Sequence, residues 1–584
     1  MFDANDGSAR RLLAEASGGD PSSDRDLGTP APLGESRSEA LRAYDRALLG
    51  PDTDESMLAQ LPVVDVRYLS ALGAAIAAGD FSGAMTTARD GWYDLLLGDR
   101  DELRRVLEGM PPAAVRERPV LSMLLGLVYY AHPYLRVKGI RYFVVAMNAA
   151  RAEQDGPSTV DRALILTSGG VAYRLIGRPE RAVGAARSAW RILLQLTEEQ
   201  RRAVPMLTAV FAQLGMTLYS SGNVDEALDV FEHGLAEAPA EGYRHGFANL
   251  SMLAGIHALR GELPEAEEYV QLARDGAWPD VLRSTYSGTF YRIAEAIIAL
   301  ERFDTHTARA HLASMVHDRR TIEHWVEIAI TEALVDLVDG KPGAAEAGLH
   351  AFASLRKGQG RSPGARARLA STRALLQLAL GNPRAASAVL QRDAVAGYAK
   401  SIGLARVQLA EGHHGAALQH IRSTSGAAMS VRWLAEAIAI EAASLLRFSE
   451  GPRAGAVVAQ LGSLLERTHQ RVALTLLPDA DFQRLAGALS DAGFSHIVSD
   501  LPARSRFPDP DSTTLLTDRE FAVLQALMRT SSAASIAAEE VVSVNTVKTQ
   551  LKSLYRKLGV SSRDEAIAIA IDRHLVVDQP ESLT

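Results

Sequence analysis

The sequence predicts an all-α protein made of many paired helices, followed by a small helical domain near the C-terminus. Apolar residues recur at the spacing of one helix face from about Ser38 to Ser499, and strand-like alternation is absent there. A short glycine–alanine pattern repeats along the same stretch. The 584 residues are too many for one hydrophobic core, so we expect several units or a repeat array.

The composition excludes several classes of function. The chain has 62 basic and 70 acidic residues, a net charge of −8, so any nucleic-acid surface must be local. It has no cysteine, which excludes disulfides and thiolate metal sites and is compatible with a reducing compartment. The N-terminus lacks the apolar core of a signal peptide, and no apolar run reaches the length of a membrane span. We therefore expect a cytoplasmic protein without membrane contact.

Residues 37–498 form the predicted repeat domain, after a segment at 1–36 whose Gly, Ser, Asp and Pro content predicts disorder. The repeated pattern is a glycine followed five residues later by an alanine. Its glycines lie about 40 residues apart or about twice that, so the two long intervals predict hidden, degenerate units. A glycine can end one helix in a left-handed conformation, and a small alanine lets the next helix approach closely. The pattern occurs at Gly79–Ala84, Gly177–Ala182, Gly222–Ala227, Gly261–Ala266, Gly340–Ala345, Gly381–Ala386 and Gly412–Ala417.

One unit, Thr208–Pro239, resembles a tetratricopeptide repeat, and the resemblance implies an α-solenoid. Solenoids generally present a concave surface, so we expect the array to bind a protein, peptide or small-molecule effector. The bulky, small and helix-ending residues that carry the resemblance are Phe211, Leu214, Gly215, Tyr219, Gly222, Ala227, Phe231 and Pro239.

A proline-containing segment at 499–514 is predicted to be a linker, and a compact domain at 515–577 follows it, ahead of a tail at 578–584. Thr517 and Glu520 form a capping box for the first helix of this domain, and Ser532–Glu540 fits a second. Ser543 can cap a third helix, and Ser562 with Glu565 opens a fourth. The third helix has one apolar stripe, formed by Val547, Leu551, Leu554 and Leu558.

The other side of the third helix is cationic. Lys548, Lys552 and Arg556 recur every four residues away from the leucines, with Thr549 and Ser553 beside them. A helix fits the major groove of DNA, where lysine attracts phosphate and guanine and a threonine can touch a thymine methyl group. Two short helices ahead of such a helix predict a helix-turn-helix. A charged helix face is also often only a solvated one.

The segments LTDRE, SVNTVKTQL and YRKLGVSSRDEA resemble the LuxR-type DNA-binding domain from Leu516 to about Ile571. The resemblance implies a transcriptional regulator that binds double-stranded DNA and forms a homodimer through its fourth helix. The whole chain is then a tetratricopeptide-like α-solenoid followed by a four-helix LuxR-type helix-turn-helix domain. Three residues would face base edges and nearby phosphates: Lys548, Thr549 and Lys552. Three more would support the backbone contacts: Asn545, Thr546 and Arg556.

The second helix departs from the family pattern. Thr530 replaces a usual glycine, Ser532–Ser535 replaces a polar stretch, and Glu540 replaces a buried leucine; in the third helix, Gln550 replaces a usual histidine. A buried carboxylate without a partner would cost several kcal/mol, so Glu540 must tilt outward or find a cation. These changes leave one alternative open, an interaction scaffold whose helix-turn-helix has lost DNA binding.

No catalytic, cofactor or metal site is predicted. The chain lacks a phosphate-binding loop motif, and the basic, glycine-rich Arg356–Arg368 is typical of a flexible loop. The histidines between His306 and His324 lack metal-ligand spacing, and the pair His413–His414 is expected to be exposed in a turn. An enzyme within the array is the remaining alternative and would need a pocket with converging titratable groups. Four tryptophans are expected as core fillers in preference to a ligand groove: Trp190, Trp278, Trp325 and Trp433.

Overall fold

The computed structural model describes most of the chain between residues 65 and 572. The internal residues outside the description are 153–156, 203, 205, 239–245, 277, 279, 316–318, 321, 357–359, 361, 394, 396, 425, 449–450, 510–517, 531, 540–541 and 559. The predicted disordered segment at 1–36 and the tail at 578–584 therefore lie outside the described residues.

The described residues fold into α-helices and short 3-10 helices. They also contain one isolated β-bridge, between Pro478 and Phe507. This confirms the all-α prediction, and none of these helices is long and apolar enough to cross a membrane. The earlier helices are α4 (Arg67–Ala77), α5 (Phe81–Asp90), α6 (Trp92–Leu97), α7 (Arg100–Glu108), α8 (Pro112–Arg116), α9 (Pro119–Ala131), η1 (Pro133–Leu135), α10 (Arg136–Arg151), α11 (Thr159–Leu175), α12 (Pro179–Gln195), α13 (Glu198–Arg202), α14 (Leu207–Ser220) and α15 (Val224–Ala236). The later helices of the array are α16 (Phe247–Arg260), α17 (Leu263–Asp275), η2 (Asp280–Arg283), η3 (Tyr286–Gly288), α18 (Thr289–Glu301), α19 (Thr305–Ala313), α20 (Trp325–Val338), α21 (Pro342–Leu355), α23 (Pro363–Ala379), α24 (Pro383–Arg392), α25 (Gly397–Ala410), α26 (His414–Arg422), α27 (Val431–Arg447), α28 (Gly451–Thr468), η4 (Val472–Leu476), α29 (Asp479–Asp491) and α30 (Ser495–Val498).

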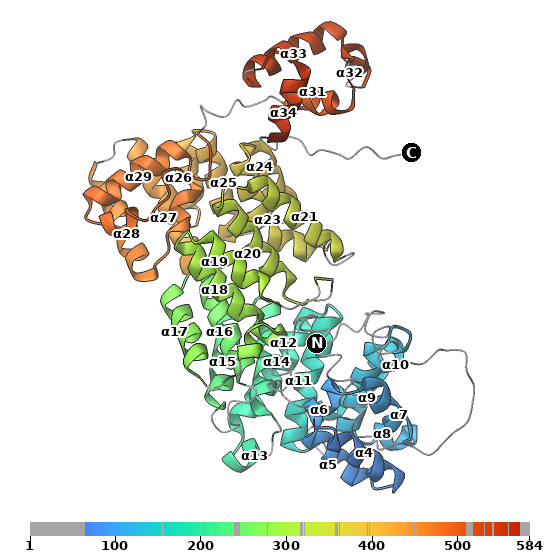
Figure 1. Ribbon diagram of the computed structural model, residues 1–584. Coiled ribbons are helices and arrows are strands. Elements are labelled where there is room, and N and C mark those ends of the chain that lie inside the picture. Colours follow the sequence, from blue (N-terminus) through green and yellow to red (C-terminus); the bar gives the residue numbers. More distant parts are fainter. Residues whose placement is uncertain are drawn as a thin grey trace. The chain divides into compact units, whose positions relative to one another are not determined.

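The repeated glycine–alanine pattern marks the turn of each helix pair, as expected from the sequence. All seven predicted glycines have a positive φ, between 72° and 83°. Each ends a helix in the left-handed conformation, which only glycine adopts without steric cost. All seven partner alanines, from Ala84 to Ala417, are buried. Successive pairs pack side by side, as α20 and α21 do with α23 (Figure 1).

One of the two hidden units is visible in the structure at α18 and α19. The turn between these helices has Phe303 where the other units have glycine, and its φ is 59°. Five residues later Ala308 is fully buried, as the pattern requires. A phenylalanine therefore occupies the left-handed position, so the glycine–alanine pattern is absent from this unit. The other long interval, between Gly79 and Gly177, holds α9 and α10, which pack closely at Gly126 and Gly139.

The unit that resembles a tetratricopeptide repeat shows why its small residues are small. A Cβ on Gly215 of α14 would lie 2.4 Å from the ring of Phe231 on α15. Real Cβ atoms do not approach this closely, so the glycine lets the phenylalanine ring cross the helix. Both Phe211 and Phe231 are buried, and Pro239 lies outside the described residues.

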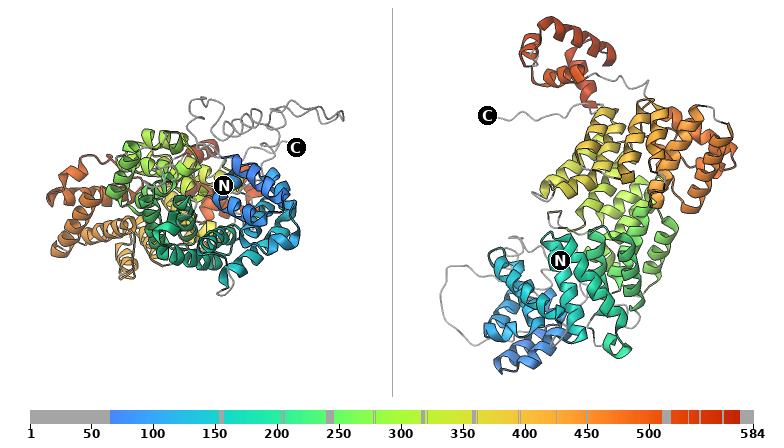
Figure 2. Two further views of the ribbon diagram at one scale, coloured as in Figure 1. Left: turned by 90° about the horizontal axis from the view of Figure 1, so that it is seen from below. Right: turned by 180° about the vertical axis from the view of Figure 1, so that it is seen from behind.

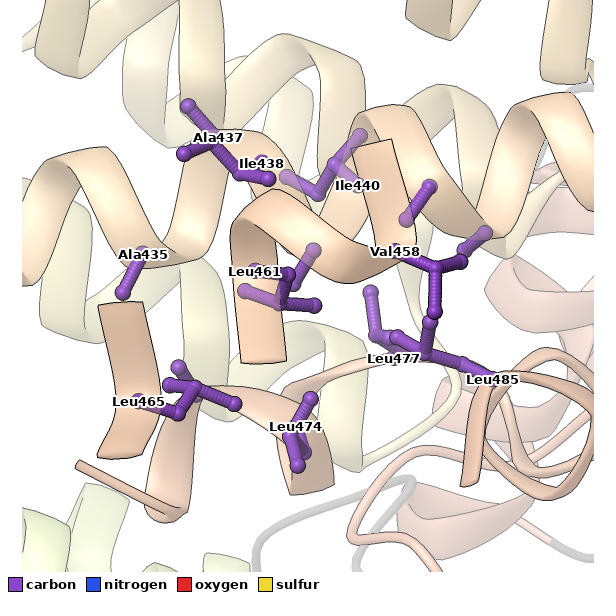
Figure 3. Close-up of a cluster of buried hydrophobic side chains, with 14 of the residues drawn as sticks. Ala435, Ala437, Ile438, Ile440, Val458, Leu461, Leu465, Leu474, Leu477 and Leu485 are labelled. Carbon is purple, nitrogen blue, oxygen red and sulfur yellow. The ribbon is translucent and has the colours of Figure 1, made fainter. Parts of the chain in front are cut away.

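The described chain divides into two compact units, and the boundary passes through α16 to α18. The first unit contains the pairs α11–α12 and α14–α15. The second contains the pairs from α20–α21 to α27–α28 and its own large core. Side chains from α27, α28, η4 and α29 point toward one another there, among them Ile438, Leu461, Leu474 and Leu485 (Figure 3).

A buried glutamate clamps four segments of the second unit together. The side chain of Glu301, at the end of α18, is 3% exposed. Its Oε2 accepts the backbone N–H groups of Arg471 and Val472 at 2.7 and 2.8 Å, and its Oε1 lies 3.2 Å from a guanidinium nitrogen of Arg432. Arg432 also donates to the carbonyls of Ala258 and Leu259, at 3.2 and 3.1 Å. We call this group the Glu301 clamp.

Part of the predicted linker at 499–514 is attached to the array. The Ser505 N–H donates to Asp479 at 2.8 Å, and the Asp509 carboxylate accepts the Ala480 N–H at 2.7 Å. Phe507 is buried and forms the β-bridge with Pro478. The chain is therefore held as far as Asp509, and residues 510–517 lie outside the description.

The C-terminal domain comprises α31 (Asp518–Arg529), α32 (Ala533–Glu539), α33 (Val544–Leu558) and α34 (Arg563–Asp572). These four helices pack on one another and form one group, drawn in red in Figures 1 and 2. They enclose a small core of their own, which includes Leu524, Ile536, Leu554 and Ala566. The four predicted helices are thus present in the predicted order.

Candidate nucleic-acid interface

Helix α33 is held by its apolar side. Val547, Leu554 and Leu558 are buried in the domain core, and Leu551 packs against its edge. The predicted stripe of four residues therefore fixes which side of α33 faces α31 and α32. Everything opposite that stripe is turned toward solvent.

A local cap fixes where α33 begins. The Ser543 hydroxyl accepts the Thr546 backbone N–H at 3.1 Å and shares a 2.7 Å hydrogen bond with the Thr546 hydroxyl. The Val547 N–H bonds to the Ser543 carbonyl at 3.1 Å. The Thr546 N–H is one of the groups that every helix start leaves without an intrahelical acceptor, and the Val547 N–H makes the first hydrogen bond of the helix. The backbone N–H and the hydroxyl group of Thr546 are both used in this cap, and the residue is only half-exposed.

The cations on the outer face are exposed. Lys548, Lys552 and Arg556 all project from the solvent side of α33. Neither lysine makes a hydrogen bond or an ion pair within the part of the chain that the structure describes, and Arg556 bonds only to the Ser553 hydroxyl there, at 3.4 Å. Their positive charge is therefore not neutralised by described acidic groups. We call these three residues the cationic row.

Asn545 and Thr549 lie beside the cationic row and are also exposed. The Thr549 hydroxyl donates to the Asn545 carbonyl at 2.9 Å, so this hydroxyl is satisfied within the helix. Five of the six predicted contact residues thus share the exposed side of α33, and the sixth, Thr546, lies at its cap. Their contacts with DNA stay a prediction.

Two further cations of this region stabilise the fold. The Lys557 Nζ lies 2.6 Å from the Glu520 carboxylate, and the Glu520 side chain is 6% exposed. An Arg563 guanidinium nitrogen donates to the Leu527 carbonyl at 2.8 Å. Lys557 and Arg563 lie beyond the C-terminal end of the cationic row, and both fix α33 and α34 against α31. Glu520, expected to reach back toward a cap at Thr517, makes this buried ion pair; Thr517 lies outside the described residues.

The turn before α32 accommodates its unusual threonine. The Thr530 N–H bonds to the Ala526 carbonyl at 2.9 Å, and its hydroxyl accepts the Ser532 N–H at 3.3 Å. Thr530 is not among the described residues with positive φ, so this turn does not need glycine. Ile536 is fully buried, as predicted. Glu540 lies outside the described residues.

The second predicted capping box is present at the start of α34. The Ser562 hydroxyl accepts the Glu565 N–H at 3.2 Å. The Glu565 carboxylate accepts the Ser561 N–H at 2.9 Å, and this backbone hydrogen bond is the main reason that the pKa of Glu565 lies below its usual value. Ala566 and Ala570 are buried in the core of the domain, and Ile567 is half-buried. A homodimer surface on α34 stays a prediction.

The array corrects two expectations about loops and turns. His413 is exposed as predicted, but His414 is buried, with its Nε2 3.1 Å from the Asp481 carboxylate. Within Arg356–Arg368, the segment from Pro363 onward is the first turn of α23, because Ser362 caps that helix and proline suits its first position. Arg356 is buried at the end of α21.

No other candidate site emerges in the described part of the array. No group of three potential metal-ligating residues is found among the described residues. Trp278 and Trp325 are buried, as expected of core fillers. Trp190 packs edge-on against Phe211 at 5.6 Å between ring centroids, and Trp433 packs against Tyr398 at 6.0 Å.

A known family matches the C-terminal domain, and parts of the chain are similar to known proteins. Residues 514–570 match the family described as "Bacterial regulatory proteins, luxR family". The chain is 31% identical over 115 residues to the HTH-type transcriptional regulator MalT of Serratia proteamaculans, and equally to that of Yersinia pestis. Each match covers 18% of this chain and 13% of the relative, so the chain covers only a small part of those proteins.

One solved structure, described as "Crystal structure of APC/C hetero-tetramer Cut9-Hcn1", aligns with 89% of this chain and 96% of that chain. The TM-score is 0.40 and the sequence identity is 13%. The family match agrees with the resemblance found in the sequence, and the C-terminal domain is a LuxR-type helix-turn-helix.

Proposed function

We propose that this protein is a transcriptional regulator that binds double-stranded DNA through α33, in the cytoplasm and without catalytic activity of its own. The observation that supports it most is the cationic row, which is exposed and opposite a buried stripe in a LuxR-type domain. A helix with these properties fits the major groove, where its lysines meet phosphates and base edges.

The salt dependence of binding tests this proposal. The affinity for DNA falls as salt concentration rises, and removal of one lysine–phosphate interaction makes the slope of log K against log salt concentration shallower by about 0.9. Lys548→Ala and Lys552→Ala in the full chain should weaken binding to promoter fragments, and substitution of whichever lysine contacts phosphate should also make that slope shallower. Arg422→Ala removes an exposed cation from α26 of the array and is the matched control. Unchanged affinity and slope in both lysine variants would contradict DNA binding by α33.

The same measurement separates the proposal from an interaction scaffold that has lost DNA binding. A scaffold would show only weak binding that the two lysine substitutions do not alter. The Thr530 turn gives no support to the scaffold, because Thr530 is hydrogen-bonded there and does not have the positive φ that would need a glycine.

We further propose that the array senses a protein, peptide or small-molecule signal and that α34 supports a homodimer on two half-sites. Solenoids use their extended surfaces for such partners, and paired helix-turn-helix domains bind half-sites about one DNA turn apart. Sedimentation of the full chain with and without a two-half-site duplex measures the stoichiometry. One chain per duplex at saturation would contradict the dimer.

A further inference from the structure

The recognition helix begins with an exposed apolar side chain that its fold does not explain. Val544 is the first residue of α33 and is 40% exposed. It is not among the residues that form or border the core of the domain. Among the described residues from 518 to 570, it is the one large hydrophobic side chain that is exposed. Packing against the described residues of the domain therefore does not account for a valine here.

Val544 lies beside Lys548, at the N-terminal end of the cationic row. Val544, Lys548, Lys552 and Arg556 follow one another at four-residue steps, which places neighbours on the same side of a helix. The N-terminal residues of a recognition helix are those that contact base edges. If the cationic row of α33 faces the floor of the major groove, Val544 lies in the groove at the N-terminal end of the helix.

The chemistry of the groove limits what Val544 can contact favourably. Its side chain carries no hydrogen-bond donor or acceptor, so it cannot form hydrogen bonds with phosphates or with the polar edges of the bases. The major groove has one apolar feature, the C5-methyl group of thymine. We infer that Val544 contacts a thymine methyl group and selects A·T over G·C or C·G at one position of each half-site. This inference rests on the proposed function.

Thr549 is the other residue on this face that could contact a methyl group. Its hydroxyl is bonded to the Asn545 carbonyl, which leaves its methyl group for such a contact. The two residues lie five positions apart along α33, so they would address different base pairs. A test must therefore assign the thymine to one of them.

The test removes the thymine methyl group from the DNA and, separately, the apolar side chain of Val544 from the protein. A duplex that the full chain binds is first selected from a randomised pool, and each thymine in it is then replaced singly by deoxyuridine. This substitution deletes only the methyl group. Burial of one such carbon is worth enough to change affinity about fourfold. We expect one deoxyuridine position per half-site to weaken wild-type binding by about that factor.

In Val544→Ser the ratio of affinities for thymine and deoxyuridine at that position should fall to about one. Val544→Ala should give an intermediate ratio, and Thr549→Ser should leave the ratio at the Val544 position unchanged. Because Val544 lies outside the core, circular dichroism of Val544→Ser should match that of the wild type.

Two results would overturn the inference, and they are distinguishable from failure of the proposed function. The first is wild-type binding that no single deoxyuridine alters; the second is a Val544→Ser variant that keeps the full effect. In either case, Lys548→Ala would still weaken binding if α33 recognises DNA. If no duplex is selected and Lys548→Ala changes nothing, both the proposed function and this inference are wrong.

Discussion

The Glu301 clamp should contribute more to stability than any single ion pair on the surface. Replacing Glu301 by alanine removes the acceptor of two buried backbone N–H groups and the partner of Arg432. The segments it joins lie far apart in the chain, so no local helix contact replaces it. We predict that Glu301→Ala lowers the free energy of unfolding of the second unit substantially.

The magnitude follows from the hydrogen bonds. A hydrogen bond to a charged group is worth about 1.5–3 kcal/mol, and Arg471 and Val472 each lose one. Arg432 loses its carboxylate partner but keeps two carbonyl acceptors, so the two backbone hydrogen bonds set the lower limit of the change. The sum is about 3–6 kcal/mol. Glu301→Gln should lose about half of this, since its oxygen can still accept both N–H groups while its amide nitrogen faces Arg432.

Urea unfolding followed by circular dichroism measures the change, and hydrogen exchange locates it. The Arg471 and Val472 amides should exchange much faster in Glu301→Ala than in the wild type. Glu180→Ala, which removes an exposed carboxylate from α12, is the control. The reasoning is wrong if the unfolding midpoint and the protection of the Val472 amide both stay at wild-type values.

Three further predictions concern the array. Phe303→Gly should be more stable than Phe303→Ala by about 1 kcal/mol in urea unfolding, because alanine keeps the strain of a φ of 59°; equal stability would contradict a strained turn. Gly215→Ala should destabilise by about 1–3 kcal/mol by pushing against the ring of Phe231, whereas a neutral result would mean that the ring moves freely. Lys341 is the main cause that holds the pKa of Asp339 at about 2, below its usual 3.8, so its contribution is present above pH 3.8 and is lost as pH falls toward 2. Asp339→Asn should thus lower stability by about 1 kcal/mol at pH 7 and change it little once the pH is below 2, a difference that pH-dependent unfolding detects.

Local chemistry explains what the sequence predicts well. A glycine that must adopt a left-handed turn and an alanine that must lie between two helices are both set by their own positions. Hence all seven repeat turns and all seven buried alanines follow from a spacing pattern. The stripe and caps of α33 are equally local, which is why the orientation of the helix follows from the sequence.

Contacts between distant residues could not be predicted in this way. Phe303 adopts the left-handed conformation of a repeat glycine, but the residue type phenylalanine does not predict a positive φ. His414 looked like a turn residue until Asp481, 67 positions later, came within hydrogen-bonding distance of it. Lys557 directly follows the last residue of the cationic row, and only the buried Glu520 shows that its charge is used within the fold.

The attachment of the chain at Asp509 has a mechanical consequence for the DNA-binding domain. Only residues 510–517 separate that anchor from the start of α31, and a stretch of this length spans at most about 30 Å. The start of α31 therefore stays within about 30 Å of the anchor at Asp509. A duplex bound by α33, as proposed, would therefore lie near this anchor, beside the part of the second unit that holds residues 505–509.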